Sequence, residues 1–191
     1  MNETINILGI AGSLRQASFN RAALRAAQGL VPAGVTLELF DLAAIPMFNQ
    51  DTEAKPPAEV VRFKQCIRAA DAILISTPEY NYSISGVLKN AIDCASRPFG
   101  DSAWAGKPVA LMGASPSLFG SARAQYHLRQ VFVAVDMLPL NRPEVMIGNA
   151  AKAFDAQGTL VDATSRDLIR KLLVELVAWT RHLKRNHAAA A

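Results

Sequence analysis

A short polar segment follows the apolar start of the chain, and its residue types suit the binding of a phosphate. An apolar run begins at Ile5 and breaks at Gly12, and a stretch rich in Ala and Leu, typical of a helix, comes soon after. The polar residues between them are Ser13, Arg15, Gln16, Ser18 and Asn20. The first N–H groups of a helix lack internal partners and lie at the positive end of its dipole. We therefore expect this loop to hold a ligand phosphate, with Arg15 adding a charge-assisted contact.

The loop lacks the glycine patterns of the common nucleotide-binding motifs. Gly9 and Gly12 are followed by no third glycine at the helix start, so the dinucleotide motif G-x-G-x-x-G is absent. Gly106-Lys107 is followed by Pro108, so the chain has no P-loop. A cradle built from hydroxyl groups suits a terminal monophosphate such as that of FMN. An ordinary helix cap explains the same serine and asparagine residues, and the loop alone leaves both interpretations open.

Composition and charge argue against several classes of function. The 191 residues are 51% apolar and 19% charged, and no apolar run reaches the ~18 residues of a membrane span. Residues 1–4 show no signal-peptide organisation, so we expect a cytoplasmic protein. The net charge of +4 favours anionic small molecules, and without basic and aromatic residues interleaved it does not indicate nucleic acid. Cys66 and Cys94 are isolated and no histidine has ligand spacing, so we expect buried thiols and no metal site.

Apolar strands alternate with helices along the whole chain. Strands are expected at 5–10, 35–40, 71–76, 107–112 and 144–147, and helices at 19–30, 58–70, 85–96, 121–136 and 162–185. This alternation predicts one α/β domain over 1–191, a doubly wound five-stranded parallel sheet with helices on both faces. The favoured strand order is 2-1-3-4-5, whose ligand crevice lies at the carboxyl ends of strands 1 and 3. Loops 12–20, 77–83 and 113–120 follow strands 1, 3 and 4, so we expect them to meet at one ligand site.

The loop that follows the third strand has unusual residue types for a plain turn. Pro78 sets its own φ and removes a donor, so we expect the following backbone N–H groups to face the polar edge of a flat heterocycle. Tyr80 and Tyr82 supply walls for such a ring. A surface turn that begins at Pro78 and leads into a capped helix is the alternative. In the long connection 41–57, we expect Ile45, Met47 and Phe48 to pin the loop down rather than to cover a pocket.

The chain resembles the NADPH-dependent FMN reductase family, and its chromate and quinone reductase branch most. The similar region spans about 5–179, and its motifs are GSLRQASFN (12–20), TPEYNYSISGVLKNAIDCASR (77–97), AGKPV (105–109) and ARAQYHLRQ (122–130). The resemblance implies a flavodoxin-like fold, FMN as cofactor and NADPH or NADH as co-substrate. It implies hydride transfer through the flavin to quinones, azo compounds, chromate or similar acceptors.

The resemblance also implies site residues. Those at the phosphate end of FMN are Ser13, Arg15, Ser18, Phe19 and Asn20. Those along the isoalloxazine, largely through backbone groups, are Pro78, Glu79, Tyr80 and Asn81. Those that close the other side of the ring and the ribityl chain are Ser115, Pro116, Ser117 and Leu118. The family forms homodimers or homotetramers, in which Arg123, Tyr126 and Glu144 form a polar cluster between subunits; a solvated face of the fourth helix is the alternative for these three.

One loop departs from the pattern of the family. The usual S-x-G-x-x-G-G is replaced by a segment in which Ser117 and Ser121 stand for glycines and Pro116 stiffens the chain. Because glycine permits positive φ and close approach, this change bears on how the loop packs against a flavin.

The chain shows no residue pattern of a catalytic triad, and a flavin site needs none because the cofactor carries the chemistry. Two other functions use the same fold. A flavodoxin-type electron carrier has no substrate turnover of its own, but such carriers tend to be acidic, and the charge of +4 argues against one. A nucleotide-binding regulatory or structural subunit would also lack turnover.

Overall fold

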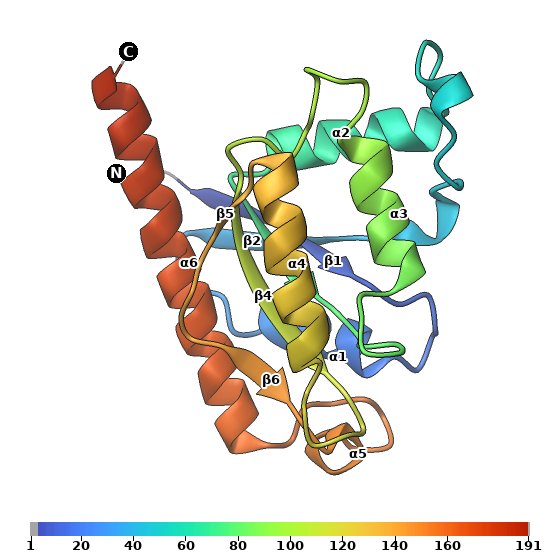
Figure 1. The fold of residues 1–191 in the computed structure, drawn as a ribbon. Helices are drawn as coiled ribbons and strands as arrows, with labels where there is room; N and C mark the ends of the chain where they lie inside the picture. Colours follow the sequence, from blue (N-terminus) through green and yellow to red (C-terminus); the bar gives the residue numbers. More distant parts are fainter. Residues whose placement is uncertain (1–3, 191) are drawn as a thin grey trace.

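A parallel sheet forms the centre of the molecule (Figure 1). The computed structural model describes residues 4–190. Residues 1–3, for which no signal peptide was expected, lie outside the described residues. The strands are β1 (Ile5–Ala11), β2 (Val35–Phe40), β3 (Ala72–Ser76), β4 (Pro108–Ala114), β5 (Leu138–Pro139) and β6 (Val145–Ile147). Their order is β2-β1-β3-β4-β5, and every pairing is parallel, which confirms the predicted topology. That all of 1–191 forms one domain stays a prediction.

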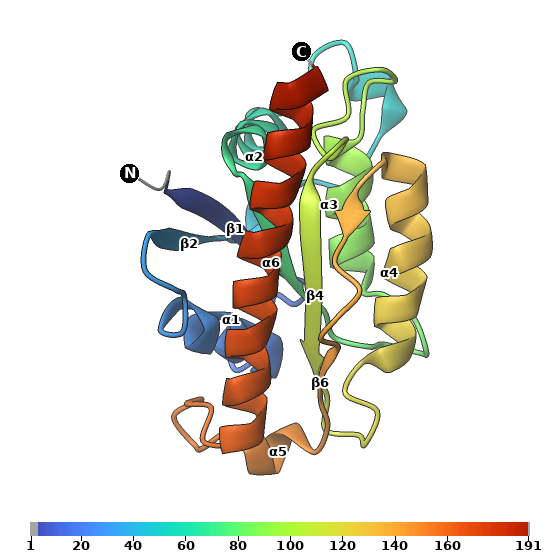
Figure 2. The same ribbon diagram turned by 90° about the vertical axis from the view of Figure 1, so that its left-hand side faces the viewer.

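Helices cover both faces of the sheet (Figure 2). One face carries α1 (Phe19–Gln28) and α6 (Ala163–Ala190), and the other carries α2 (Ala58–Ala69), α3 (Gly86–Ala95) and α4 (Ala122–Val135). A short helix, α5 (Ala150–Ala153), lies between β6 and α6. Every residue of β3 and β4 is buried, which explains why both strands are continuous apolar runs. Within 4–190, no helix has the length and apolar character needed to cross a membrane.

The fifth position of the sheet differs from the single strand expected at 144–147. It consists of two short strands, β5 and β6, that both pair with β4. Leu138 aligns with Pro108 and Val145 with Met112, and the chain between them leaves the sheet. Pro139 has no N–H to donate, and the edge of the sheet tolerates it for that reason. A strand of two residues is too short to show any periodicity, so the sequence pattern did not reveal β5.

Gly113 lies where β4 and the start of α4 approach too closely for a side chain. A Cβ at this position would overlap the Oγ of Ser121 and would lie 2.5 Å from the carbonyl oxygen of Thr77. Ser121 itself has a φ of 69°, the left-handed conformation that glycine adopts most easily. Its Oγ accepts a hydrogen bond from Nε2 of Gln125 at 3.3 Å. The serine that replaces a glycine here therefore keeps the backbone shape that a glycine would have.

We expect Gly113→Ala to lower the free energy of unfolding by about 3 kcal/mol, because the new methyl group must displace β4 or α4. Urea denaturation of the purified variant measures this loss. The double variant Gly113→Ala/Ser121→Gly should recover only part of it, since the contact with the Thr77 carbonyl remains. A single Gly113→Ala variant as stable as the unchanged protein would contradict the packing described here.

Candidate functional site

The loops after β1, β3 and β4 meet at the carboxyl ends of the strands, in the lower part of Figure 1. The backbone N–H of Gly12 donates to the Ser76 carbonyl at 2.9 Å, and the Oγ of Ser85 donates to the Gly12 carbonyl at 2.6 Å. A Cβ on Gly12 would lie only 2.9 Å from the ring of Pro78, so the first two loops are in contact there. The backbone N–H of Thr77 donates to the Met112 carbonyl. This bond joins the second loop to β4, the strand that leads into the third loop. The three loops therefore meet at one place, as the strand order predicts.

The side chain of Asn20 joins the three loops at one point. Its Nδ2 donates to the carbonyl oxygen of Ala114 at 2.9 Å, and its Oδ1 accepts from the backbone N–H of Ala114 at 2.9 Å. The same Oδ1 accepts from the Ser76 hydroxyl at 3.0 Å. The amide is buried, and these bonds use its oxygen twice and one of its two N–H groups. Asn20 therefore positions the loops, and its contact with a phosphate stays a prediction.

The segment before α1 presents unpaired backbone donors at a helix N-terminus. Ser18 is the N-cap, and its Oγ accepts from the N–H groups of Asn20 and Arg21 at 3.2 and 3.4 Å. Within residues 4–190, the N–H groups of Gln16, Ala17 and Phe19 donate to no other group. These unpaired donors, at the positive end of the α1 dipole, are what a phosphate dianion requires. The residues present therefore fit the terminal phosphate of FMN.

Two more predicted residues of this loop flank the same donors. The Ser13 side chain is buried, and its Oγ accepts from Arg15 N at 3.4 Å. The Arg15 side chain is exposed and lies over the Phe19 ring, 5.8 Å from its centroid. Ser13 therefore fixes the loop, while the guanidinium of Arg15 is available to an anion.

The loop 77–83 forms a tight turn rather than an open row of donors. Tyr80 and Ser83 exchange two backbone hydrogen bonds of 3.0 Å, and Asn81 and Tyr82 between them have φ of 50° and 67°. The expectation that Tyr80 offers its N–H to a ligand is therefore wrong, because Ser83 accepts that hydrogen bond. The N–H groups of Glu79 and Asn81 have no partner within the described residues and stay available.

The carboxylate of Glu79 ties this loop to the start of α4, a contact that no local sequence pattern predicts. Its Oε2 accepts from the backbone N–H of Arg123 at 3.0 Å and from that of Ala124 at 3.4 Å. The N-cap of α4, Ser121, makes no capping bond with its own side chain, so Glu79 supplies the missing acceptor. The Glu79 side chain is only 7% exposed and also pairs with the guanidinium of Arg123. This hydrogen bond raises the pKa of Arg123 above its ordinary value, so the group stays charged.

Arg123 also joins the second and third loops. Its guanidinium carbon lies 3.8 Å from the centre of the Tyr82 ring and 4.7 Å from that of Phe119. The other two residues of the predicted subunit cluster pair with each other, because the hydroxyl of Tyr126 donates to Glu144 at 3.2 Å. In this structure Arg123 contacts the loops 77–83 and 115–121 and does not join that pair.

Serine side chains organise the loop 115–121. The hydroxyls of Ser115 and Ser117 share a hydrogen bond of 3.0 Å, and Ser117 N donates to Ser115 Oγ at 3.2 Å. The Ser117 carbonyl accepts from Asn149 N at 2.9 Å, which fastens the loop to the start of α5. Leu118 and Phe119 are 77% and 58% exposed. The loop therefore presents two apolar side chains, and that of Phe119 shares the Arg123 guanidinium with Tyr82.

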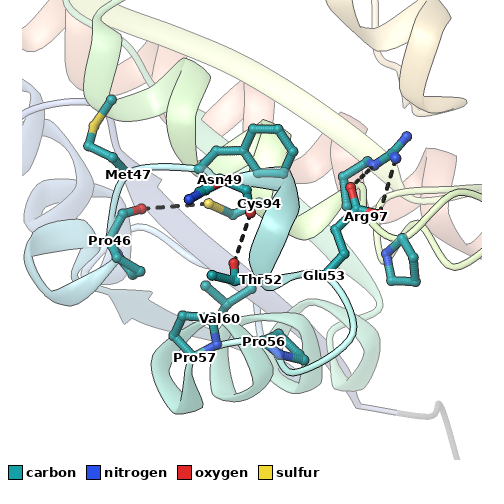
Figure 3. Close-up of a pocket in the computed structure, with 12 residues that line it drawn as sticks. Pro46, Met47, Asn49, Thr52, Glu53, Pro56, Pro57, Val60, Cys94 and Arg97 are labelled. Atoms are coloured by element: carbon teal, nitrogen blue, oxygen red, sulfur yellow. Dashed lines mark hydrogen bonds and ion pairs between the residues drawn. The ribbon is translucent and has the colours of Figure 1, made fainter.

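A separate cavity beneath the connection 41–57 is too small for a cofactor (Figure 3). Its volume is about 30 Å³, and it is lined in part by Pro46 and Cys94. Ile45 packs against the core and pins the connection as expected. The side chains of Met47 and Phe48 are exposed and line this cavity, so for them the expectation of pinning rather than covering a pocket is wrong. Asn90 of α3 holds the backbone here, since it accepts from Phe48 N at 2.7 Å and donates to the Pro46 carbonyl at 2.8 Å.

The two cysteines differ in exposure. Cys94 is buried, and burial raises the pKa of its thiol. Cys66 is half-buried, so the expectation of a buried thiol is only partly right for this residue. Among residues 4–190, no three His, Cys, Asp or Glu side chains gather in a way that could hold a metal ion.

Known proteins resemble this chain over nearly its full length. A family model described as NADPH-dependent FMN reductase matches residues 5–152. An NAD(P)H-dependent FMN reductase of Pseudomonas aeruginosa is 56% identical over 186 residues, which cover 96% of this chain and 100% of the relative. A quinone reductase of Pseudomonas putida is 40% identical over 182 residues, covering 95% and 97%. The solved structure of FerB, a flavoenzyme NAD(P)H:(acceptor) oxidoreductase from Paracoccus denitrificans, has a TM-score of 0.86 and 34% identity and covers 94% and 98%.

We expect Asn20→Ala to lower the free energy of unfolding by at least about 3 kcal/mol. The substitution leaves the N–H and C=O of Ala114 and the hydroxyl of Ser76 buried without partners, and each such group costs about 1–3 kcal/mol. Urea denaturation measures the loss. Gln16→Ala, an exposed change in the same loop, is the matched control and should unfold like the unchanged protein. Equal stability of the two variants would refute the joining role of Asn20.

We expect Glu79→Ala to weaken FMN binding roughly fivefold to tenfold, because a lost helix cap is worth about 1 kcal/mol and the turn at 77–83 loses its anchor. Titration of the flavin-free protein with FMN in a calorimeter measures the affinity. Glu59→Ala is the control, since Glu59 pairs with Arg62 within α2 on the surface. If both variants bind FMN like the unchanged protein, the link between Glu79 and α4 does not shape the site.

Proposed function

The chain belongs to the NADPH-dependent FMN reductase family, and from that premise we propose how its three loops hold the flavin and admit substrates. It is a flavin-dependent NAD(P)H oxidoreductase that uses FMN and acts on quinones. The structural feature that carries the residue assignments is the set of unpaired donors at the start of α1, next to the turn at 77–83.

The phosphate of FMN binds at the N-terminus of α1. The backbone N–H groups of Gln16, Ala17 and Phe19 donate to its oxygens, and the guanidinium of Arg15 adds a charge-assisted contact. Ser18 supports this arrangement through its capping bonds, and Ser13 through its bond to Arg15 N. Asn20 supports the loop from behind through Ala114, and its second amide N–H is left for the phosphate end of the cofactor.

The flavin ring lies against the turn at 77–83. Pro78 is buried and forms the floor, while the N–H groups of Glu79 and Asn81 are the donors placed to meet the polar edge of the ring. The Tyr80 side chain, 51% exposed, is a wall. Donors fixed in this way stabilise negative charge on a reduced ring without reorganising when the charge appears.

The loop 115–118 closes the other side of the ring and the ribityl chain. Ser115 and Ser117 hold its shape, Pro116 stiffens it, and Leu118 presents an apolar side chain. The exposed apolar groups of Leu118 and Phe119 suit a flat, apolar acceptor such as a quinone. Nicotinamide and quinone then use one open face in turn, which predicts ping-pong kinetics.

Bound FMN would supply the hydride and two-electron chemistry that links NAD(P)H to the acceptor. The role of the protein is to bind the phosphate of FMN, to hold the polar edge of the flavin ring and to leave one face of the ring open. The relatives are named as reductases, which favours an enzyme over a flavodoxin-type carrier or a regulatory subunit.

Three finer points belong to the same proposal. Azo compounds and chromate are further acceptors, and the net charge of +4 favours the approach of an anion such as chromate. The chain forms a homodimer or homotetramer through α4, whose outer face exposes Tyr126 and Val133 beside Glu144. Its location is the cytoplasm.

The flavin spectrum provides the direct test. We expect the FMN-loaded protein to lose its yellow absorbance when NADPH or NADH is added without oxygen, and to regain it when one equivalent of benzoquinone per flavin follows. Stopped-flow absorbance measures both steps. Protein that binds FMN but keeps its absorbance with both nicotinamides would overturn the reductase assignment. Protein that binds no FMN would overturn the site as well.

A further inference from the structure

A groove continues from the phosphate loop along α1 toward the start of α6. Its first part, of about 450 Å³, lies between residues 15–19 and the turn 155–158. Its second part, of about 280 Å³, reaches Leu30, Leu160 and Arg166. The two parts share Arg25 and Gly158 in their walls, so they are continuous. Figure 2 shows the elements that border the groove: α1 lies beside the lower part of α6, and the loop that precedes α6 lies beneath α1.

Three arginine side chains face this groove without an acidic partner. Arg15, Arg25 and Arg166 are exposed, and none of them forms an ion pair in the described part of the chain. Arg21 on the same helix differs, since it pairs with Asp41 at 3.0 Å. Like charges that share one groove repel each other, and an anion bound between them would remove that cost.

One acidic side chain, Asp155, also lines the groove. Its Oδ1 accepts from the backbone N–H groups of Gln157 and Thr159 at 3.0 and 2.7 Å, so the carboxylate holds its own turn together. Three guanidinium groups against one carboxylate leave the groove with a net positive charge of two. That charge equals the negative charge of a nucleoside diphosphate diester.

The floor of the groove is apolar and the distances suit a nucleotide. Ala22, Ala26, Leu30 and Leu160 line it between the arginines. Arg25 lies seven residues beyond Ser18, which is about 10 Å along the axis of a helix. Because long helical side chains point back toward the N-terminus, the Arg25 guanidinium approaches the phosphate loop. The distance from Ser18, where the first phosphate is proposed to bind, to a flat base on the apolar floor is therefore short enough for a diphosphate to span.

We propose that this groove binds the adenylate half of FAD, so that the chain accepts FAD as well as FMN. The proposal rests on the flavin site proposed above, because the first phosphate lies at the start of α1 in both cofactors. The second phosphate contacts Arg15 and Arg25, and the adenine lies on the apolar floor beneath Arg166. An FMN-specific site would be closed behind its phosphate, whereas this one opens into the groove.

Calorimetric titration of the flavin-free protein with FMN, FAD and AMP tests the proposal. We expect FAD to bind within about threefold of FMN or more tightly. Arg25→Ala and Arg166→Ala should each weaken FAD binding at least tenfold and leave FMN binding within twofold. Arg21→Ala is the matched control, since Arg21 lies on α1 outside the groove and should change neither affinity. AMP should weaken the apparent affinity of FAD and not that of FMN.

Several results would overturn it. FAD that binds thirtyfold more weakly than FMN, or arginine variants that weaken both flavins equally, would show that the groove does not hold an adenylate group. AMP that binds the FMN-loaded protein while FAD fails to bind the flavin-free protein would point instead to a separate nucleotide site. In each case FMN binding and reduction by NADPH would leave the proposed function standing. Failure of both flavins to bind would remove the proposed function together with this inference.

Discussion

The site depends on the need to satisfy buried backbone groups where the parallel strands end. A strand that stops inside the protein leaves N–H and C=O groups without ladder partners, and each is costly if it stays unpaired. The amide of Asn20 meets both groups of Ala114 at the end of β4 and also takes the Ser76 hydroxyl at the end of β3. Because Asn20 lies in the first turn of α1, the same bonds set where the N-terminus of that helix points. This contact therefore also fixes the positions of the N–H groups of Gln16, Ala17 and Phe19.

A second constraint works in the same way on the other side of the site. The first turn of α4 lacks a capping side chain of its own, and Glu79 provides the acceptor from the turn at 77–83. Asn20 and Glu79 are thus polar loop residues whose side chains bond to distant backbone groups of the protein. The contact of Glu79 also joins the turn at 77–83 to α4, the helix that carries Tyr126.

The sequence predicted the strand order and the meeting of three loops because both follow from the alternation of apolar runs with helices and from general rules of parallel sheets. It also identified the segment before α1, where serine and asparagine mark a helix start. It missed contacts between residues distant in the chain, such as Glu79 with Arg123 of α4, which no local pattern encodes. It missed the pairing of Tyr80 with Ser83, because Asn81 and Tyr82 adopt positive φ without glycine. The replacement of a glycine by Ser121 suggested a changed loop, yet the backbone at 121 is left-handed all the same.

The positive charge of the groove beside α1 arises from arginines that only the folded structure brings together. Arg166 is far in sequence from Arg15 and Arg25, and each by itself is an ordinary exposed arginine. The turn at 155–158 lines the groove that all three border, and its tightness matters because Gly158 has a φ of 78° and a Cβ there would lie 3.3 Å from Nη2 of Arg25. A larger residue at 158 would be strained and would crowd that guanidinium. The turn therefore keeps the groove open between the segment before α1 and Arg166.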